Sequence, residues 1–378
     1  MLDILKQLVA FQTVDGNSDA AQRAFDYIAA FLETRGMFVE RYTFDGYPAL
    51  AATIKPHYKT PTVMLTAHVD VVPASNNMFE LREGDGKLYG RGVFDMKFAV
   101  ACYLQLVDDL KDELNRYDFG ILLTCDEERG NTEGINGTKG MVAKGYLPRV
   151  CILPDGGDNW NIERLAKGAW HVAVTATGQA AHGSRPWEGE SATETLMKAL
   201  QEIRALFPEQ QPYSNTLNIS MIGGGEAVNQ IPTEAWAVLD IRTMDHRSLA
   251  LIKNDVQSIC YKYNLSAQET TNIPPLVTDL ENPFVHDFIT SVETITGHEC
   301  EPTVSFGASD GMYFNAHDIP VVQVRPAGGG HHGDHEWIDL QDFLYYKDVL
   351  IDYLKRVLNE PVGKVITTTP QEALTKTV

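Results

Sequence analysis

Acidic and imidazole side chains recur at strand ends, or in the loops that follow, throughout the predicted α/β part of the chain. These side chains are His68 and Asp70, Asp95, Glu127 and Glu128, Asp155, and His331 with His332. A set of imidazoles and carboxylates without a thiolate suits Zn, Mn or Co, and differs from structural zinc sites built on cysteine. The residue types therefore predict a site for divalent metal ions.

Taken singly, each residue has an ordinary explanation. A lone histidine near a strand end is usually satisfied by hydrogen bonds, and an aspartate in a glycine-rich loop, such as Asp95, is usually a turn former or helix cap. Adjacent glutamates are usually solvated, and the Asp-Gly-Gly sequence at Asp155 is usually a turn. Metal ligands in α/β folds are commonly carried by strand ends, and coincidence at four consecutive ends is much less expected than at one. We therefore favour one shared site.

Such a site has a definite chemistry. One carboxylate can bridge two metal ions about 3.5–4 Å apart, the spacing of hydrolytic two-metal centres. Another carboxylate, just outside the coordination shell, can accept a proton from the attacking water. The sequence predicts a hydrolase with two divalent ions, zinc being favoured and cobalt or manganese being alternatives.

The elements that must position these residues alternate between helix and strand over roughly the first 160 residues. Apolar residues on one helical face predict helices, and short apolar runs predict buried strands. The predicted helices are 18–36 and 98–111, and the predicted strands are 62–72, 119–125 and 149–153. Strands separated by helices indicate an α/β catalytic domain with a mostly parallel sheet covered on both faces.

The pattern changes near Gly168 and returns to α/β after Pro274-Pro275. Between these points, paired strands and two helices predict an inserted α+β domain with a four-stranded antiparallel sheet. The predicted domains are therefore 1–167 with 276–378, and an inserted domain, 168–275. In the returning part we expect helices at 283–296 and 339–357 and a strand at 319–325, and the tail after Glu360 has no pattern.

Composition excludes several classes of function. The chain of 378 residues has a net charge of −20, so it repels phosphate backbones and anionic lipids, and neither nucleic acid nor a membrane is an expected partner. The five cysteines are odd in number and widely spread, which predicts buried free thiols in a reducing compartment. No secretory signal is evident at the start, so we expect a cytoplasmic protein.

Three elements in order resemble a known family: H-x-D at His68, G-R-G-x-x-D-M-K at residues 90–97, and D-E-E at residues 126–128. The chain resembles the co-catalytic metallopeptidases and deacylases, which include acetylornithine deacetylase, succinyl-diaminopimelate desuccinylase, glutamate carboxypeptidase, aminoacylase and cytosolic di- and tripeptidases. The resemblance covers most of the chain, and the three elements together are highly specific. It implies amide-bond hydrolysis in a small N-acyl amino acid or short peptide.

The resemblance also implies a ligand set. Asp95 would bridge both metal ions, His68 and Asp155 would bind the first ion, and Glu128 and His332 would bind the second.

Two further carboxylates receive catalytic roles from the resemblance. Asp70 would hold the orientation of the His68 imidazole, and Glu127 would act as general base and acid. The Asp95–Met96 peptide is expected to be cis.

In the inserted domain, the resemblance assigns substrate contacts. His182 would reach the scissile carbonyl, while Asn229 and Arg242 would bind a substrate carboxylate. The ordinary alternatives are a turn residue for Asn229 and a surface salt bridge for Arg242. The loop at residues 307–310 also fits the family, near the pocket. The resemblance further implies a homodimer through this domain, with His182 completing the site of the partner chain.

Three positions depart from the family pattern. Phe98 follows the D-M-K element where the family usually has glycine. His335 stands where the family often has an acidic residue or Asn. With His331 this makes three neighbouring imidazoles, so the choice of His332 rests on its spacing to Glu336-Trp337. Asp stands at position 155 where many deacylases of the family carry Glu, which favours a peptide with a free amino end.

The sequence disfavours two other functions. A cysteine or serine hydrolase requires a nucleophile beside a base, and no Cys or Ser has the matching sequence context. A catalytically silent binding protein on the same fold is disfavoured because every catalytic position is intact.

Overall fold

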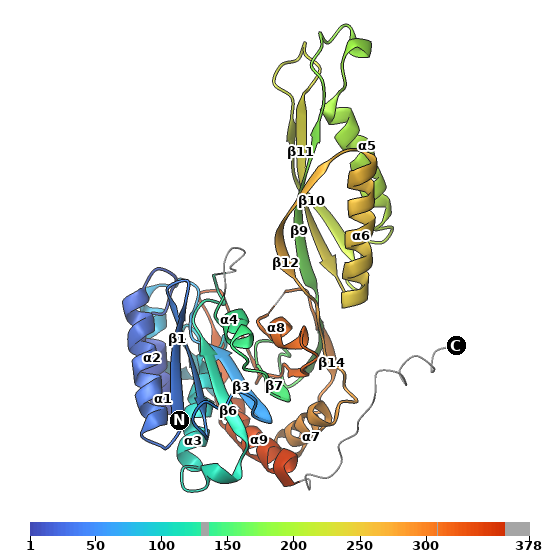
Figure 1. Ribbon diagram of the computed structural model, residues 1–378. Coiled ribbons are helices and arrows are strands. Elements are labelled where there is room, and N and C mark those ends of the chain that lie inside the picture. Colours follow the sequence, from blue (N-terminus) through green and yellow to red (C-terminus); the bar gives the residue numbers. More distant parts are fainter. Residues whose placement is uncertain (130–135, 308, 360–378) are drawn as a thin grey trace, which may run out of the picture.

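The computed structural model describes residues 1–129, 136–307 and 309–359, so residues 130–135, Ala308 and the tail from Glu360 onward lie outside the described residues. Figure 1 shows a body built from both ends of the chain and an elongated unit that projects from it. The projecting unit is formed by the middle of the sequence, as the change of pattern near Gly168 predicts.

A six-stranded sheet forms the centre of the body within the described residues. Its order in space is β1 (Phe38–Phe44), β2 (Tyr47–Thr53), β6 (Phe119–Thr124), β3 (Val63–His68), β7 (Val150–Ile152) and β15 (Val321–Val322). The strands from β6 to β15 run parallel, whereas β1 and β2 form an antiparallel hairpin at one edge. Every residue of β3 and β6 is buried, which explains their continuous apolar composition. The predicted mostly parallel sheet is confirmed.

Helices cover this sheet on both sides, and Figure 1 shows α2 and α4 on opposite sides of it. The helices of the body are α1 (Leu2–Ala10), α2 (Ser18–Glu33), α3 (Lys97–Asp109), α4 (Gly137–Ala143), α7 (Pro283–Thr296), α8 (Gly311–Asn315) and α9 (Leu340–Asn359), with short 3-10 turns η1 (Asn76–Phe79) and η2 (Leu114–Arg116). No helix in the described ranges is long and apolar enough to cross a membrane. All five cysteines are free and buried, as predicted.

The departure at Phe98 is explained by the core. Phe98 lies on α3 and is fully buried. Its ring packs edge-on against Tyr346 of α9, with 5.3 Å between ring centroids. The larger side chain therefore fills space between two helices and does not enter the metal site.

The projecting unit is a four-stranded antiparallel sheet backed by two helices, as predicted. Its spatial order is β10 (Thr216–Gly224), β11 (Glu234–Thr243), β9 (Gly168–Thr177) and β12 (Ser266–Ile273), with α5 (Ala192–Ala205), α6 (His246–Lys262) and the turn η3 (Pro186–Glu188). Burial alternates along β9 and β11 because one face packs on α5 and α6. The unit has its own hydrophobic cluster, separate from that of the body.

Two small sheets, which the sequence pattern did not predict, frame the site. One consists of β13 (Leu276–Val277), β8 (Ile162–Ala166) and β14 (Pro302–Ser305), and the other of β16 (Gly328–Gly329), β17 (Trp337–Asp339), β5 (Lys87–Tyr89) and β4 (Arg82–Gly84). The second sheet pairs Trp337 with Tyr89 and so brings the loop after residue 330 beside the loop at residues 90–95. Strands of two or three residues are too short to give a periodic signal.

Two predicted strands were too long. The strand expected at 62–72 ends at His68, and the following segment is buried without being a strand, since the Val69 amide bonds to Thr124 and the Val71 amide to Thr13. The strand expected at 319–325 is reduced to β15, because the backbone beyond Val322 bonds to the loop at residues 157–163. In both places the apolar composition correctly predicted buried residues. These residues are buried without pairing as β-strands over the whole segment, so the strands were predicted too long.

Candidate metal centre and catalytic cavity

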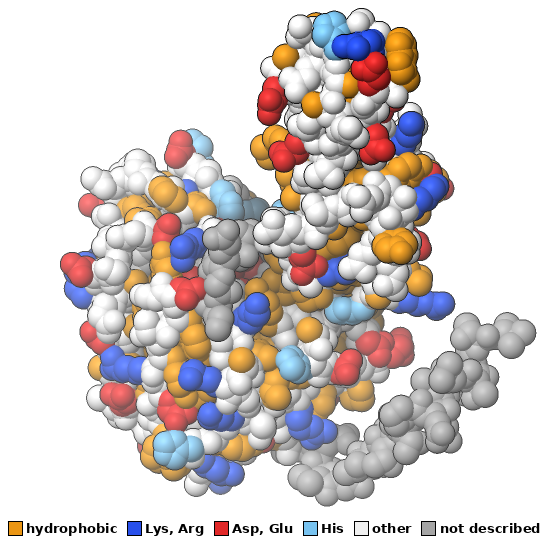
Figure 2. Space-filling view, turned by 45° about the horizontal axis from the view of Figure 1, so that its top comes forward, with side chains coloured by type: hydrophobic (Ala, Val, Ile, Leu, Met, Phe, Trp, Pro, Cys, Tyr) orange, Lys and Arg blue, Asp and Glu red, His pale blue; other side chains and the backbone are white. Residues whose placement is uncertain are grey.

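A cavity of about 550 Å³ opens at the carboxyl ends of the parallel strands β6 and β7. It is lined, among others, by Asp95, Glu127, Glu128, Asp155 and His332. His68, at the end of β3, lies behind them and is 2% exposed. In Figure 2, histidine side chains are visible in the hollow where the body meets the projecting unit. The structure thus brings together residues that are up to 264 positions apart, from His68 to His332.

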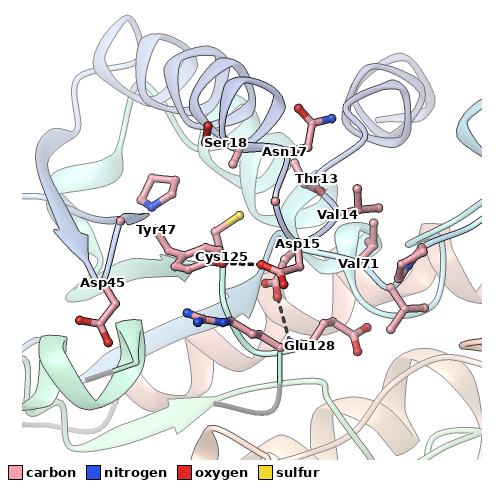
Figure 3. Close-up of a pocket in the computed structure, with 18 residues that line it drawn as sticks. Thr13, Val14, Asp15, Asn17, Ser18, Asp45, Tyr47, Val71, Cys125 and Glu128 are labelled. Atoms are coloured by element: carbon pink, nitrogen blue, oxygen red, sulfur yellow. Dashed lines mark hydrogen bonds between the residues drawn. The ribbon is translucent and has the colours of Figure 1, made fainter. Parts of the chain in front are cut away.

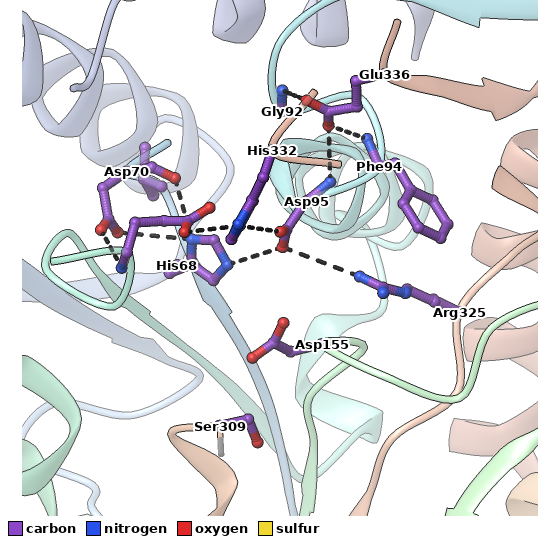
Figure 4. A network of polar contacts seen from close by, with 12 residues as sticks. His68, Asp70, Gly92, Phe94, Asp95, Asp155, Ser309, Arg325, His332 and Glu336 are labelled. Carbon is purple, nitrogen blue, oxygen red and sulfur yellow. Dashed lines mark hydrogen bonds and ion pairs between the residues drawn. The ribbon is translucent and has the colours of Figure 1, made fainter. Parts of the chain in front are cut away.

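Asp95 lies at the middle of the polar cluster (Figure 4). Its Oδ1 is 3.3 Å from Nε2 of His68, and its Oδ2 is 3.3 Å from Nε2 of His332. The same His332 nitrogen is 2.9 Å from Oε2 of Glu128. Potential ligand atoms of His68, Asp95 and Glu128 all lie within 4.8 Å of one another. A central carboxylate flanked by an imidazole on each side is the arrangement that a bridging ligand requires.

Asp70 fixes two members of this cluster. Its backbone carbonyl lies 3.0 Å from Nδ1 of His68, and its carboxylate Oδ1 is 3.6 Å from the same nitrogen. Because a carbonyl can only accept, Nδ1 must be the donor, which leaves Nε2 of a neutral imidazole free to bind a metal. Oδ2 of Asp70 also accepts a hydrogen bond from the amide of Glu128, at 2.9 Å.

The loop that carries Asp95 is held by Glu336, a residue whose role the sequence analysis missed. The Glu336 carboxylate is fully buried and accepts hydrogen bonds from the Arg91 guanidinium at 2.7 Å and from the amides of Gly92, Phe94 and Asp95 at 2.9–3.0 Å. Figure 4 shows it directly above the Asp95 backbone. The Asp95–Met96 peptide is cis, as expected. In the sequence, Glu336 is marked only as a charged residue directly before the apolar pair Trp337-Ile338, and this pattern does not predict its role.

Arg325 is a second residue that the sequence analysis missed, although it ends the strand predicted at 319–325. Its Nε donates to Asp158 at 2.6 Å, and one terminal nitrogen is 3.9 Å from Oδ1 of Asp95. The guanidinium also lies 4.0 Å from the centre of the Phe94 ring. The rule that strand ends carry site residues would have found it.

Of the three neighbouring imidazoles, His332 is the one that reaches the cluster. His331 lines the cavity but packs against the Phe94 ring, at 5.8 Å between centroids, and against His332. No contact of His335 with the cluster occurs within the described chain. The geometry therefore favours His332 as the ligand, in agreement with the spacing argument.

In this cluster, carboxylate groups outnumber the two imidazoles of His68 and His332, so negative charge is in excess. Desolvation and the Asp95 charge raise the pKa of Glu128 and of Asp155 to about 7. Desolvation and the Asp155 charge raise the pKa of Glu127 well above its usual range. Burial opposes two further shifts. The carboxylates of Asp70 and then Asp95 raise the pKa of His68 well above its usual range, and hydrogen bonds from His332 and then His68 lower the pKa of Asp95. Crowded carboxylates of this kind are stabilised in their charged form by a cation.

The residues present fit a divalent metal ion. Oε1 of Glu128 and Oδ1 of Asp70 are buried without a hydrogen-bond partner among the described residues. An unpaired buried carboxylate oxygen costs free energy unless a cation or donor reaches it. In Figure 4 the Asp155 carboxylate points toward His68 and Asp95 across the remaining gap. Nitrogen and oxygen donors without sulfur suit catalytic zinc or a related ion.

A second, smaller cavity lies on the far side of Asp70. It has a volume of about 210 Å³ and is lined mainly by the segment 13–18, the turn at 45–48 and the segment 70–73 (Figure 3). Asp15 and Tyr47 are hydrogen-bonded to each other in its wall. Glu128 and Asp70 line it too, so it adjoins the metal cluster.

The three predicted substrate contacts of the projecting unit do not lie together. His182 and Asn229 are exposed neighbours, joined by a hydrogen bond from the Gly183 amide to the Asn229 carbonyl at 2.7 Å. Their segments follow β9 and precede β11, at the end of the sheet away from the body (Figure 1). Arg242 lies near the opposite end of β11 and pairs with Asp240 at 2.8 Å. These three residues do not line the metal cavity of their own chain.

A deep polar cavity with clustered carboxylates and imidazoles, on a parallel α/β sheet, defines a metal-dependent hydrolase. The family model described as Peptidase family M20/M25/M40 matches residues 64–356. The chain therefore belongs to this family and is a metal-dependent amidohydrolase, as the sequence motifs predicted.

Sequence relatives are similar over most of the chain. Succinyl-diaminopimelate desuccinylase of Xanthobacter autotrophicus is 28% identical over 346 residues, which cover 85% of this chain and 90% of the relative. The enzyme of the same name from Rickettsia felis is 26% identical and covers 94% of this chain and 100% of the relative.

Solved structures share the fold. A tripeptidase from Staphylococcus aureus has a TM-score of 0.71 and 20% identity, covering 94% of this chain and 97% of that structure. Human carnosine dipeptidase 1 has a TM-score of 0.62 and 16% identity, covering 94% and 95%. The predicted combination of a parallel-sheet body and an inserted antiparallel domain is confirmed by these neighbours.

Proposed function

We propose that this chain hydrolyses an amide bond in a small N-acyl amino acid or short peptide. The reaction would use two divalent ions held around Asp95, and zinc is the preferred ion. The observation that carries the proposal is the position of Asp95 between His68 and His332, each 3.3 Å from one of its two carboxylate oxygens. In this scheme His68 and Asp155 bind one ion, and Glu128 and His332 bind the other. Cobalt and manganese are alternatives with the same ligand preference.

When bound, such ions supply Lewis acidity and lower the pKa of water. The protein groups then have separate tasks. Glu127 lines the cavity beside Glu128 and takes the proton of the attacking water, then delivers it to the leaving amine. Burial and the Asp155 charge raise the pKa of Glu127, which makes its carboxylate a stronger proton acceptor. Asp70 keeps Nε2 of His68 directed at the cluster.

Stabilisation of the oxyanion and orientation of the substrate are assigned to the projecting unit. His182 would donate to the oxyanion, and Asn229 and Arg242 would bind a substrate carboxylate. Because His182 and Asn229 lie far from their own cavity, we propose a homodimer in which each chain donates them to the other. The domain boundaries 1–167 with 276–378, and 168–275, belong to this proposal, as does a cytoplasmic location, which the five free thiols support.

The test is metal analysis combined with a substrate panel. Protein freed of chelator and loaded with Zn, Mn or Co should hold close to two ions per chain and should hydrolyse members of a panel of N-acyl amino acids and short peptides. Chelation should abolish the activity, and Asp95→Ala should lose metal. Turnover that survives with no bound metal would refute the proposal and revive a cysteine or serine hydrolase. Bound metal with no turnover on the whole panel would revive a binding protein.

A further inference from the structure

One wall of the catalytic cavity carries a carboxylate that the proposed reaction does not use. Glu163 lies on β8 and lines the cavity together with Asp155, yet it is only 5% exposed. Its Oε2 packs so closely on Gly156 that a Cβ at that glycine would be 2.2 Å away. The carboxylate also accepts a hydrogen bond from the Gly157 backbone. Glu163 is therefore fixed directly behind the loop that presents Asp155.

In the described part of the chain Glu163 forms no ion pair, although the Arg325 charge lowers its pKa from a distance. The cavity is lined by six carboxylates and one guanidinium, those of Asp95, Glu127, Glu128, Asp155, Asp158, Glu163 and Arg325. Arg325 is committed to Asp158, at 2.6 Å. Glu163 is the one carboxylate of the six that is neither in this ion pair nor among the proposed metal ligands and general base.

Three side chains that line the cavity beside Glu163, those of Asn161, Thr303 and Ser305, are neutral, and each takes part in one hydrogen bond with the backbone. Asn161 accepts from the amide of Glu301, Thr303 donates to the carbonyl of Ile162, and the Ser305 hydroxyl accepts from the Gly307 amide. Burial and the Asp155 charge raise the pKa of Glu163 to about 8, the direction expected when no close cation offsets a carboxylate. A positive group entering here would favour the ionised form of Glu163, and a negative group would be repelled.

We infer that Glu163 is a specificity-determining residue, which selects substrates that place an ammonium group, the free amino end of a short peptide, at this end of the cavity. The inference rests on the proposed function, because it takes this cavity as the place of hydrolysis. Acyl groups that end in a carboxylate, such as N-succinyl, are disfavoured by the same charge. Uncharged acyl groups such as N-acetyl gain nothing from Glu163.

The test compares trialanine, N-acetyl-trialanine and N-succinyl-trialanine as substrates of the metal-loaded protein. The wild type should prefer trialanine. Glu163→Gln keeps the size of the side chain but removes its charge, so kcat/KM for trialanine should fall about 10- to 100-fold, the loss of one charge-assisted hydrogen bond, mainly through KM. Hydrolysis of N-acetyl-trialanine should change less than about threefold, which is under 0.7 kcal/mol by the usual conversion. Glu301→Gln, an exposed carboxylate on the neighbouring segment, is the matched control and should behave as wild type.

A binding measurement separates this inference from the catalytic proposal. Calorimetry with Glu127→Gln protein should show tighter binding of trialanine than of N-succinyl-trialanine, and the added Glu163→Gln change should remove the difference. If the Glu163→Gln protein still bound trialanine more tightly than N-succinyl-trialanine, the inference would be overturned, because the preference would then not depend on the charge of the carboxylate. A wild-type preference for N-succinyl-trialanine would overturn it too. Absence of any hydrolysis with the binding preference intact would count against the proposed function alone.

Discussion

Replacement of Glu336 by glutamine should weaken both the fold and the metal centre, although it changes only one oxygen to an amide nitrogen. One carboxylate oxygen of Glu336 accepts from the Arg91 guanidinium and the Gly92 amide, and the other accepts from the amides of Phe94 and Asp95. In either orientation of a glutamine, its NH2 group faces two donors. Glu336 is fully buried, so no water can replace the lost acceptor without a rearrangement.

The size of the effect follows from these contacts. Two hydrogen bonds to a charged acceptor contribute about 1.5–3 kcal/mol each. Removal of one partner from a buried ion pair, here leaving Arg91 at 2% exposure, costs about 3–5 kcal/mol. We therefore expect Glu336→Gln to lower the free energy of unfolding by about 4 kcal/mol, or the melting temperature by about 5 °C for a protein of this size. Metal affinity should fall about 10- to 100-fold, because the Asp95 backbone loses its anchor.

The assay is thermal unfolding of metal-free protein at one scan rate, followed by zinc titration against a competing chelator. Asp334→Asn, an exposed carboxylate in the same loop, is the matched control and should resemble wild type in both measurements. If Glu336→Gln melts within about 1 °C of wild type, which is less than about 1 kcal/mol by the same scaling, and binds zinc equally well, the buried carboxylate does not organise the Asp95 loop.

Three further changes test other parts of the structure. Glu127→Gln should keep both metal ions and lose about 10²- to 10⁴-fold in turnover, the contribution of a positioned base. Inactive His182→Ala and Glu127→Gln proteins, mixed and allowed to exchange subunits, should recover about a quarter of wild-type activity, since half the dimers are mixed and each has one intact site. Gly140→Ala should destabilise the body by about 1–3 kcal/mol, because the added Cβ would lie 2.3 Å from the Phe44 ring, despite the better helix propensity of alanine.

Each of these expectations has its own contrary result. An active Glu127→Gln protein would reassign the two adjacent glutamates. No recovery in the mixture, after mass-tagged subunits have been shown to exchange, would place His182 in its own chain's site or outside catalysis. An unchanged urea midpoint for Gly140→Ala would mean that the Phe44 ring moves aside at no measurable cost.

Much of the catalytic body was predictable because its signals are local. Continuous apolar runs in β3 and β6 reflect strands buried on both faces, and the polar residues that follow them reflect the edge where those strands end. The hairpin of β1 and β2 was not predicted, although its burial pattern is clear in the structure. In β9 and β11, buried and partly exposed residues alternate, because only one face of this sheet is covered. This alternation predicted the antiparallel sheet of the projecting unit.

The sequence by itself determined the chemistry of this protein: the residue types at successive strand ends, their order and the family they define are all properties of local segments. Only the tertiary structure decided which of three imidazoles meets Asp95, that Glu336 holds the Asp95 loop, that Glu163 faces the cavity, and that His182 lies far from the cavity of its own chain. These facts depend on contacts between segments distant in sequence, such as Asp95 and Glu336, which are 241 positions apart. A side chain's type is written in the sequence, but its partners are set by how the sheets and loops pack together.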